Sequence, residues 1–194
     1  MIPPNLSFEI SSPTLDLFLY HWASRYRDEN KDVKFYDPYI GKTDLKTDEA
    51  ALKELFKWKN GGKISEAKLA SIHANYFQCW TEDADLESRF LCSKEKGGPI
   101  WNIFYLHCRF PDRYPIYDQH AHRAMVYIQE HTIREDLSTK AGLVYDSYKH
   151  YRCFVTHIRR TTGNNLRTID RAFYTFGQFL KLAKPFWNPA QHQP

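Results

Sequence analysis

The stretch from Tyr114 to Met125 reads YPIYDQHAHRAM and gathers ionisable side chains where a helix is expected to begin. Asp118, His120 and Arg123 follow one another in the order Asp-x-His-x-x-Arg. An aspartate is a good helix N-cap because its carboxylate accepts hydrogen bonds from backbone N–H groups. Those bonds and the helix dipole keep the carboxylate ionised. A fixed negative charge of this kind can stabilise positive charge on a sugar while a glycosidic bond breaks.

A purely structural interpretation of the same residues stays open. Asp118 would then be only the N-cap of the following helix, and His120 and Arg123 would pack and pair around its first turn.

Composition favours one globular domain spanning residues 1–194. The chain is 42% hydrophobic and 16% aromatic, enough to bury a sizeable core. Its first residues do not resemble a signal peptide and no stretch is long and apolar enough for a membrane span, so we predict a cytoplasmic protein without a membrane partner. The cysteines at 79, 92, 108 and 153 lack metal-ligand spacing, so neither a metal nor a disulfide framework is predicted.

Almost every segment carries helical signals, so the predicted fold class is all-α. Helices are expected over residues 14–26, 65–80, 83–92, 100–108, 143–160 and 165–184. Two more are expected between the cap candidate Thr47 and the stop at residues 60–62, and after Asp118. Residues 34–41, KFYDPYIG, are expected to form a loop punctuated by proline and glycine.

The order of a glycine pair, a short helix that begins at a proline, a loop, and then Asp-x-His-x-x-Arg resembles the helix-hairpin-helix DNA glycosylases. Gly97 and Gly98 correspond to the hairpin, residues 100–108 to the helix after it, and Asp118 to the catalytic aspartate. The family hairpin usually reads Gly-x-Gly, whereas this chain reads KEKGGPIW. The specific part of the resemblance spans about thirty residues, 94–123.

The resemblance implies a monomeric, cofactor-free enzyme that flips a damaged or modified base out of double-stranded DNA and excises it, in repair or in defence against phage. Members that also cut the strand carry a lysine two positions beyond the second glycine, where this chain has Ile100. A monofunctional enzyme that uses water as its nucleophile is therefore expected, without a Schiff base.

Candidates for the DNA contacts are basic or glycine residues, and candidates for the base pocket are aromatic. Residues 149–171 are rich in cations, and on a helix the row of Lys149, Arg152 and Arg159 is offset from an apolar row. The predicted DNA-binding residues are Lys94, Lys96, Gly97, Gly98, Arg123, Arg152, Arg159 and Arg160, and the predicted base-pocket residues are Phe35, Tyr36, Tyr39, Trp101 and His120.

Two other functions stay open. Arg152 and His157 fit the Arg-x4-His pattern, which resembles the motif of the all-helical HEPN ribonucleases, enzymes that usually work as dimers. Alternatively, the chain is a helical DNA-binding module without catalytic activity, in which Asp118 is dispensable.

Overall fold

The computed structural model describes residues 12–42, 44–77, 85–92, 97–134 and 137–186, and these ranges contain helices and no strand. The predicted all-α class is therefore confirmed. The helices are α1 (Ser12–Ala23), α2 (Glu29–Phe35), α3 (Glu49–Lys59), α4 (Glu66–Ile72), α5 (Leu86–Phe90), α6 (Pro99–Arg109), α7 (Gln119–Glu130), α8 (Ala141–Thr162) and α9 (Leu166–Ala183), with the short turns η1 (His73–Phe77) and η2 (Lys184–Phe186).

The contacts within the chain form two compact units. Unit 1 comprises Met1–Tyr26 and Pro115–Pro194, and unit 2 comprises Arg27–Tyr114. The helices of unit 1 are α1, α7, α8 and α9, and those of unit 2 are α2 to α6. A single domain over residues 1–194 stays a prediction.

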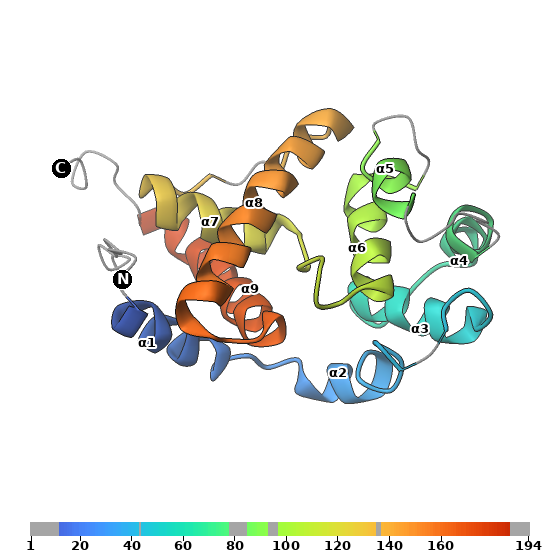
Figure 1. Cartoon of the computed structure of the whole chain (residues 1–194), viewed down its shortest axis with the longest axis horizontal. Coiled ribbons are helices and arrows are strands. Elements are labelled where there is room, and N and C mark those ends of the chain that lie inside the picture. Colours follow the sequence, from blue (N-terminus) through green and yellow to red (C-terminus); the bar gives the residue numbers. More distant parts are fainter. Residues whose placement is uncertain (1–11, 43, 78–84, 93–96, 135–136, 187–194) are drawn as a thin grey trace. The chain divides into compact units, whose positions relative to one another are not determined.

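Helix α9 forms the centre of unit 1, where it contacts α1, α7 and α8 (Figure 1). Its predicted stripe of Ile169, Phe173, Phe176 and Leu180 is fully buried. Each phenylalanine contributes about 1.5–3 kcal/mol by leaving water. Phe176 stacks edge-on against Phe18 of α1, with 5.1 Å between the ring centroids. The period of 3.6 residues therefore predicted this core correctly.

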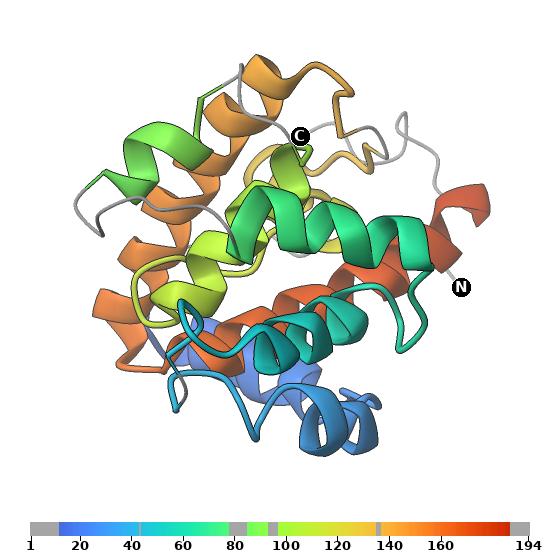
Figure 2. The same ribbon diagram turned by 90° about the vertical axis from the view of Figure 1, so that its right-hand side faces the viewer.

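Helix α6 forms the centre of unit 2, and Figures 1 and 2 show it beside α3 and α5. Phe104 packs edge-on against Phe56 of α3 at 5.4 Å, and Tyr105 packs against Phe90 of α5 at 4.9 Å. Pro99 occupies the first turn of α6, as predicted, because its missing N–H has no partner to lose there.

Several local predictions were wrong. Helix α2 was not expected, because it has only seven residues and exposes Val33, so it carries no apolar stripe. The N-cap of α3 is Asp48 rather than Thr47, and its carboxylate accepts the N–H of Ala51. Helix α4 ends at Ile72 and is followed by the π-helical turn η1. The α-helix is therefore shorter than the predicted range of residues 65–80. The last residues of that range, 78–80, lie outside the described residues.

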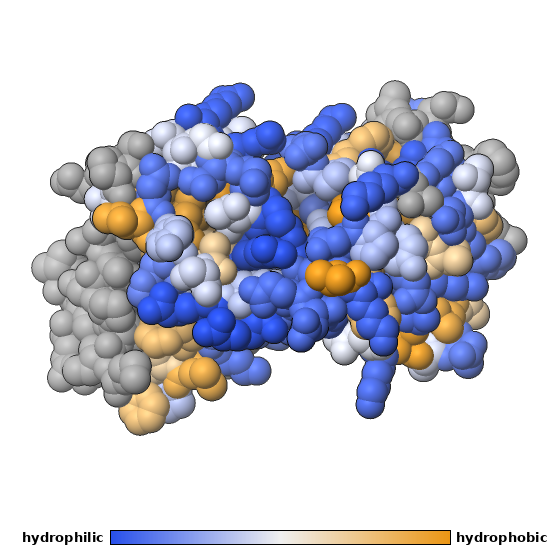
Figure 3. Space-filling model, turned by 90° about the horizontal axis from the view of Figure 1, so that it is seen from below, coloured by the Kyte–Doolittle hydropathy of each residue, from blue (hydrophilic) through white to orange (hydrophobic). Residues whose placement is uncertain are grey.

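On the face shown in Figure 3, hydrophilic residues cover most of the described surface and hydrophobic residues form separate spots. No described helix has both the length and the apolar character that a membrane span requires.

Candidate functional site

Asp118 lies at the start of α7, in unit 1, and is half-buried. Its backbone is extended, with φ of −158° and ψ of −175°. One carboxylate oxygen, Oδ1, accepts the backbone N–H of His120 at 2.8 Å and that of Ala121 at 3.0 Å. The predicted N-cap is thus confirmed. These two bonds hold the carboxylate in one orientation at the positive end of the helix dipole.

His120 and Arg123 pack around this helix start, as the structural interpretation proposed. Arg123 is 1% exposed, and its Nη1 donates to the carbonyl of Gly177 in α9 at 2.8 Å. The same nitrogen lies 3.2 Å from Nδ1 of His120. Burial lowers the pKa of His120, and this outweighs the opposite effect of Asp118.

The burial of Arg123 corrects its predicted role as a DNA contact. A guanidinium that is 1% exposed does not reach a phosphate from this position. It instead joins α7 to α9, because its hydrogen bond spans 54 residues of sequence. His120 remains half-buried at the edge of the same contact.

Gly177 brings the backbones of α7 and α9 together. A Cβ atom on this residue would lie well within 3.0 Å of the backbone of His120. The first turn of α7, and with it Asp118, is therefore positioned by a contact that only glycine permits.

Two buried tyrosines, Tyr117 and Tyr151, interact electrostatically with Asp118. The pKa of Tyr117 is raised to about 12, chiefly by burial; the hydrogen bond with Ser147 lowers it and the charge of Asp118 raises it. Burial also raises the pKa of Tyr151 well above its usual value, with further contributions from Asp170 and Asp118. These phenols are thus uncharged at neutral pH. Tyr151 makes no hydrogen bond through its hydroxyl within the described part of the chain.

A second carboxylate, that of Asp170, also acts on this region. Asp170 of α9 is 6% exposed, and its Oδ2 accepts the backbone N–H of Ile116 at 3.4 Å. Ile116 precedes Asp118 by two residues, so Asp170 fixes the loop that leads into α7. The residues around Asp118 therefore come from α7, α8 and α9 of one unit.

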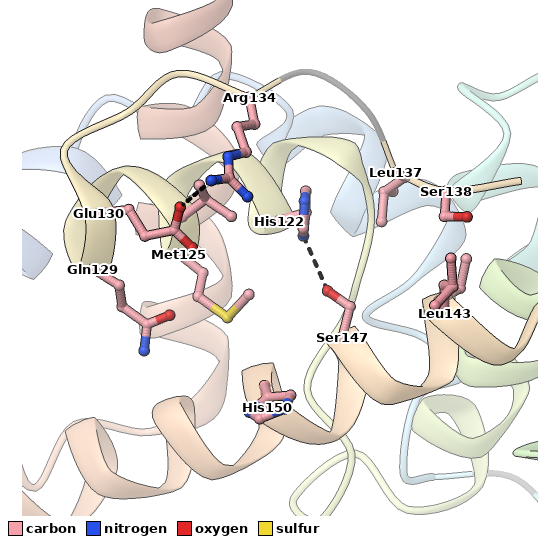
Figure 4. A pocket seen from close by; sticks show the side chains of 12 residues that line it. His122, Met125, Gln129, Glu130, Arg134, Leu137, Ser138, Leu143, Ser147 and His150 are labelled. Carbon is pink, nitrogen blue, oxygen red and sulfur yellow. Dashed lines mark hydrogen bonds and ion pairs between the residues drawn. The ribbon is translucent and has the colours of Figure 1, made fainter. Parts of the chain in front are cut away.

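A pocket of about 490 Å³ opens between α7 and α8 (Figure 4). Its lining includes His122 and Ser147, whose Nδ1 and Oγ atoms are 3.2 Å apart. The hydroxyl of Tyr117 contacts both, at 2.9 Å from His122 and 2.7 Å from Ser147. Met125, Val126, Leu143 and Val144 supply the apolar wall. The pocket contains no residue of the predicted site, and Asp118 is not part of its lining.

The predicted hairpin residues lie in unit 2, at the start of α6. Gly97 and Gly98 both have positive φ, of 99° and 84°. A Cβ on Gly97 would lie within 3.0 Å of Tyr76 and Asn102, whose side chains are hydrogen-bonded at 2.7 Å. Gly98 is the exposed N-cap of α6, without a side-chain cap bond. Lys94 and Lys96 lie outside the described residues.

The predicted base-pocket residues of unit 2 lie in different surroundings. Tyr36 is 3% exposed, and its hydroxyl donates to Nε2 of His107 at 2.6 Å, since Nδ1 of that histidine donates to a carbonyl. Tyr36 is thus a core residue. Phe35 ends α2 rather than lying in a loop, and Tyr39 lies half-exposed in the following turn. Trp101 packs against Phe56, with 5.0 Å between the ring centroids.

The basic row on α8 lies where the helical pattern predicted it. Tyr148, Tyr151, Val155 and Ile158 are buried, while Lys149, Arg159 and Arg160 are exposed and Arg152 is half-exposed. His157, also exposed, follows Arg152 by five residues on one continuous helix. Five residues correspond to about 140° around the helix axis. Within one chain, Arg152 and His157 therefore diverge and do not converge on one phosphate.

Comparisons with family models, with curated proteins and with solved structures each returned no match to this chain. Within the described ranges, His, Cys, Asp and Glu side chains do not come together in threes as metal ligands would.

Proposed function

We propose that the chain is a monofunctional DNA glycosylase that flips a damaged or modified base out of double-stranded DNA and leaves an abasic site. The observation that carries the proposal is the state of Asp118. Two backbone N–H groups orient its carboxylate at a helix start, and its charge raises the pKa values of the buried Tyr117 and Tyr151. A fixed negative charge that is already oriented interacts favourably with positive charge that develops nearby.

In the proposed reaction the bond between the base and C1′ of the deoxyribose breaks, and the base leaves with the electron pair. The sugar becomes positively charged, and the carboxylate of Asp118 stabilises that charge. A water molecule then attacks C1′, and its proton passes to the carboxylate or to solvent. Ile100 lies in the first turn of α6. In the helix-hairpin-helix DNA glycosylases that also cut the strand, a lysine stands at the corresponding position. Isoleucine offers no amine for a Schiff base.

The residues that hold DNA in this proposal belong to two places. Gly97 and Gly98 offer backbone N–H groups at the start of α6, where glycine allows the close approach of a phosphate. Arg152, Arg159 and Arg160 offer cations along α8. We infer a monomer, located in the cytoplasm and acting without a cofactor.

The test is an excision assay on duplexes that carry deaminated, alkylated, oxidised or phage-type modified bases, with mass spectrometry of the released base. We expect one class of base to be released and the strand to break only after alkali. Borohydride added during turnover should trap no covalent protein–DNA adduct.

Three outcomes would contradict the proposal. If no base is released but the chain binds DNA, the chain is a binding module. If RNA is cut in a manner that requires Arg152 and His157, the HEPN-like alternative holds. A trapped adduct that disappears on mutation of one lysine would show a lyase.

A further inference from the structure

The pocket between α7 and α8 joins a polar cluster to an apolar wall within unit 1 (Figure 4). Its volume of about 490 Å³ falls in the range of sites that take small molecules. The apolar wall includes Met125 and Val126 of α7 and Leu143 and Val144 of α8. Because Asp118 does not line this pocket, what binds here is a separate question from the proposed base excision.

Three side chains form a hydroxyl relay that ends at a histidine. The Oγ of Ser147 lies 2.7 Å from the phenol oxygen of Tyr117, and that oxygen lies 2.9 Å from Nδ1 of His122. Burial raises the pKa of Tyr117, and the hydrogen bond with Ser147 opposes this rise, as a donor to the phenol oxygen does. Ser147 therefore donates to Tyr117, and Tyr117 donates its single hydroxyl proton to Nδ1 of His122.

The order of this relay makes His122 a hydrogen-bond donor towards the pocket. Burial, followed by the charge of Arg123, lowers the pKa of His122, so its ring is neutral at neutral pH. A neutral imidazole carries one N–H, and since Nδ1 accepts, that N–H belongs to Nε2. Within the described part of the chain, the hydrogen bonds of this ring go to Nδ1. The ring lines the pocket, so its Nε2–H is offered to a ligand.

The cations that act on His122 are already engaged within the protein. Arg123 and Arg134 both lower the pKa of that ring. Arg123 donates to the carbonyl of Gly177 at 2.8 Å, and Arg134 pairs with Glu130 at 2.8 Å. An anion in the pocket would give up water while competing with these bonds for the same guanidinium groups. A neutral acceptor requires only the N–H of His122.

We propose that the pocket binds a neutral small molecule that carries a carbonyl group on an aromatic or branched apolar body. The carbonyl oxygen accepts the Nε2–H of His122, and the apolar body packs against Met125 and Leu143. Methionine suits this position because its flexible thioether adapts to the shape of a ring and contacts it favourably. Figure 4 shows the contact between His122 and Ser147 spanning from α7 to α8, where it closes the polar part of this surface.

The test uses benzamide as the probe and the methionine methyl groups as reporters. Met1 and Met125 are the two methionines of the chain, and Met125 lines the pocket. Isotopic labelling of the methyl groups therefore gives an NMR signal from the pocket, and the Met125→Leu variant assigns it. Benzamide should shift this signal with a Kd on the order of 1 mM, as expected for a ligand of this size.

The His122→Phe variant separates the hydrogen bond from the apolar contact. It keeps an aromatic ring but lacks the N–H, so it should weaken benzamide binding about tenfold. Toluene has no carbonyl and should bind this variant at least as tightly as the parent. His150→Phe is the matched control, since His150 also lines the pocket but takes no part in the relay. It should change the affinity for benzamide by less than about twofold.

A second measurement needs no variant. NMR of isotope-labelled histidine in the parent chain shows which ring nitrogen carries the proton, and we expect Nε2 of His122 to carry it and to shift when benzamide is added. A proton on Nδ1 would overturn the relay and with it the proposal.

Three further results would contradict the proposal. These are a Met125 signal that benzamide does not move, equal losses of benzamide affinity in the two phenylalanine variants, and tighter binding of benzoate than of benzamide, which would indicate an anion site. Each of them would leave the proposed base excision untouched, and an absence of base excision would leave benzamide binding untouched.

Discussion

Helix α7 of unit 1 and helix α6 of unit 2 are capped at their N-termini in different ways. Both helices begin after a turn that contains proline or glycine, and both starts are held by a glycine packed closely against neighbouring groups. Asp118 caps α7 with its side chain, whereas Gly98 caps α6 without a side-chain bond. The start of α7 therefore presents a carboxylate, and the start of α6 presents backbone N–H groups.

This difference gives the two helix starts opposite electrostatic character. At α7, the N–H groups of His120 and Ala121 are used to orient the carboxylate of Asp118. At α6, Gly98 has no side-chain cap bond among the residues that the structure describes, and the helix dipole favours an anion there. A negative charge suits a developing sugar cation, and backbone donors suit a phosphate. Four predictions test this contrast.

The largest expected effect on stability comes from Gly177→Ala. The added Cβ would collide with the backbone of His120, which has no rotamer to move away, so α7 must shift from α9. We expect a loss of about 3 kcal/mol in the free energy of unfolding, measured in urea. The matched control is Gly142→Ala in α8, where the Cβ meets open space. It should be neutral or stabilise by up to about 1 kcal/mol. Equal effects of the two substitutions would show that Gly177 does not position α7.

A smaller effect is expected at the other helix start, where Gly97→Ala and Gly98→Ala form a natural pair. Both residues have positive φ, so each substitution costs about 1–2 kcal/mol in backbone strain. Only the Gly97 variant also displaces Tyr76 and Asn102. We expect it to lose roughly 1–3 kcal/mol more than the Gly98 variant. Urea unfolding of both proteins measures this difference, and a difference near zero would mean that the turn is not held by that contact.

The smallest effect concerns pH. Burial lowers the pKa values of His120 and His122 below the usual 6.5, so the folded chain binds their protons less readily than the unfolded chain. Above pH 6.5 these histidines are neutral in both states and do not lower the free energy of unfolding. As the pH falls through 6.5, the unfolded chain takes up their protons first, so the free energy of unfolding declines. His122→Gln should therefore make the stability change between pH 7 and pH 5 shallower than in the parent. A steeper decline in the variant would contradict the assignment of a neutral His122.

The fold was largely predictable because its helices carry strong local signals. The stripe on α9 and the buried row on α8 follow directly from the helical period, and Asp118 is a cap that its residue type indicates. Helix α2 lacks such a stripe and was missed. Local patterns therefore predicted long amphipathic helices better than short ones.

The site was less predictable, because its contacts join residues far apart in sequence. The burial of Arg123 depends on the carbonyl of Gly177, 54 residues away. The stacking of Arg171 on Tyr26 links opposite ends of the chain. The sequence analysis placed Arg167 and Arg171 within the cation-rich residues 149–171, but nothing local showed that the ring of Tyr26 lies beside them.

Excision by the Asp118→Asn variant tests the central claim most directly. Asparagine keeps a similar shape and a side-chain oxygen that caps α7, so the variant should fold and should still bind DNA. It lacks the negative charge, and we expect base release to fall by at least about 100-fold, which corresponds to about 3 kcal/mol of transition-state stabilisation. The measurement is single-turnover release of the base at saturating enzyme. Release at the parent rate would contradict the catalytic role of Asp118 and would leave it as a helix cap alone.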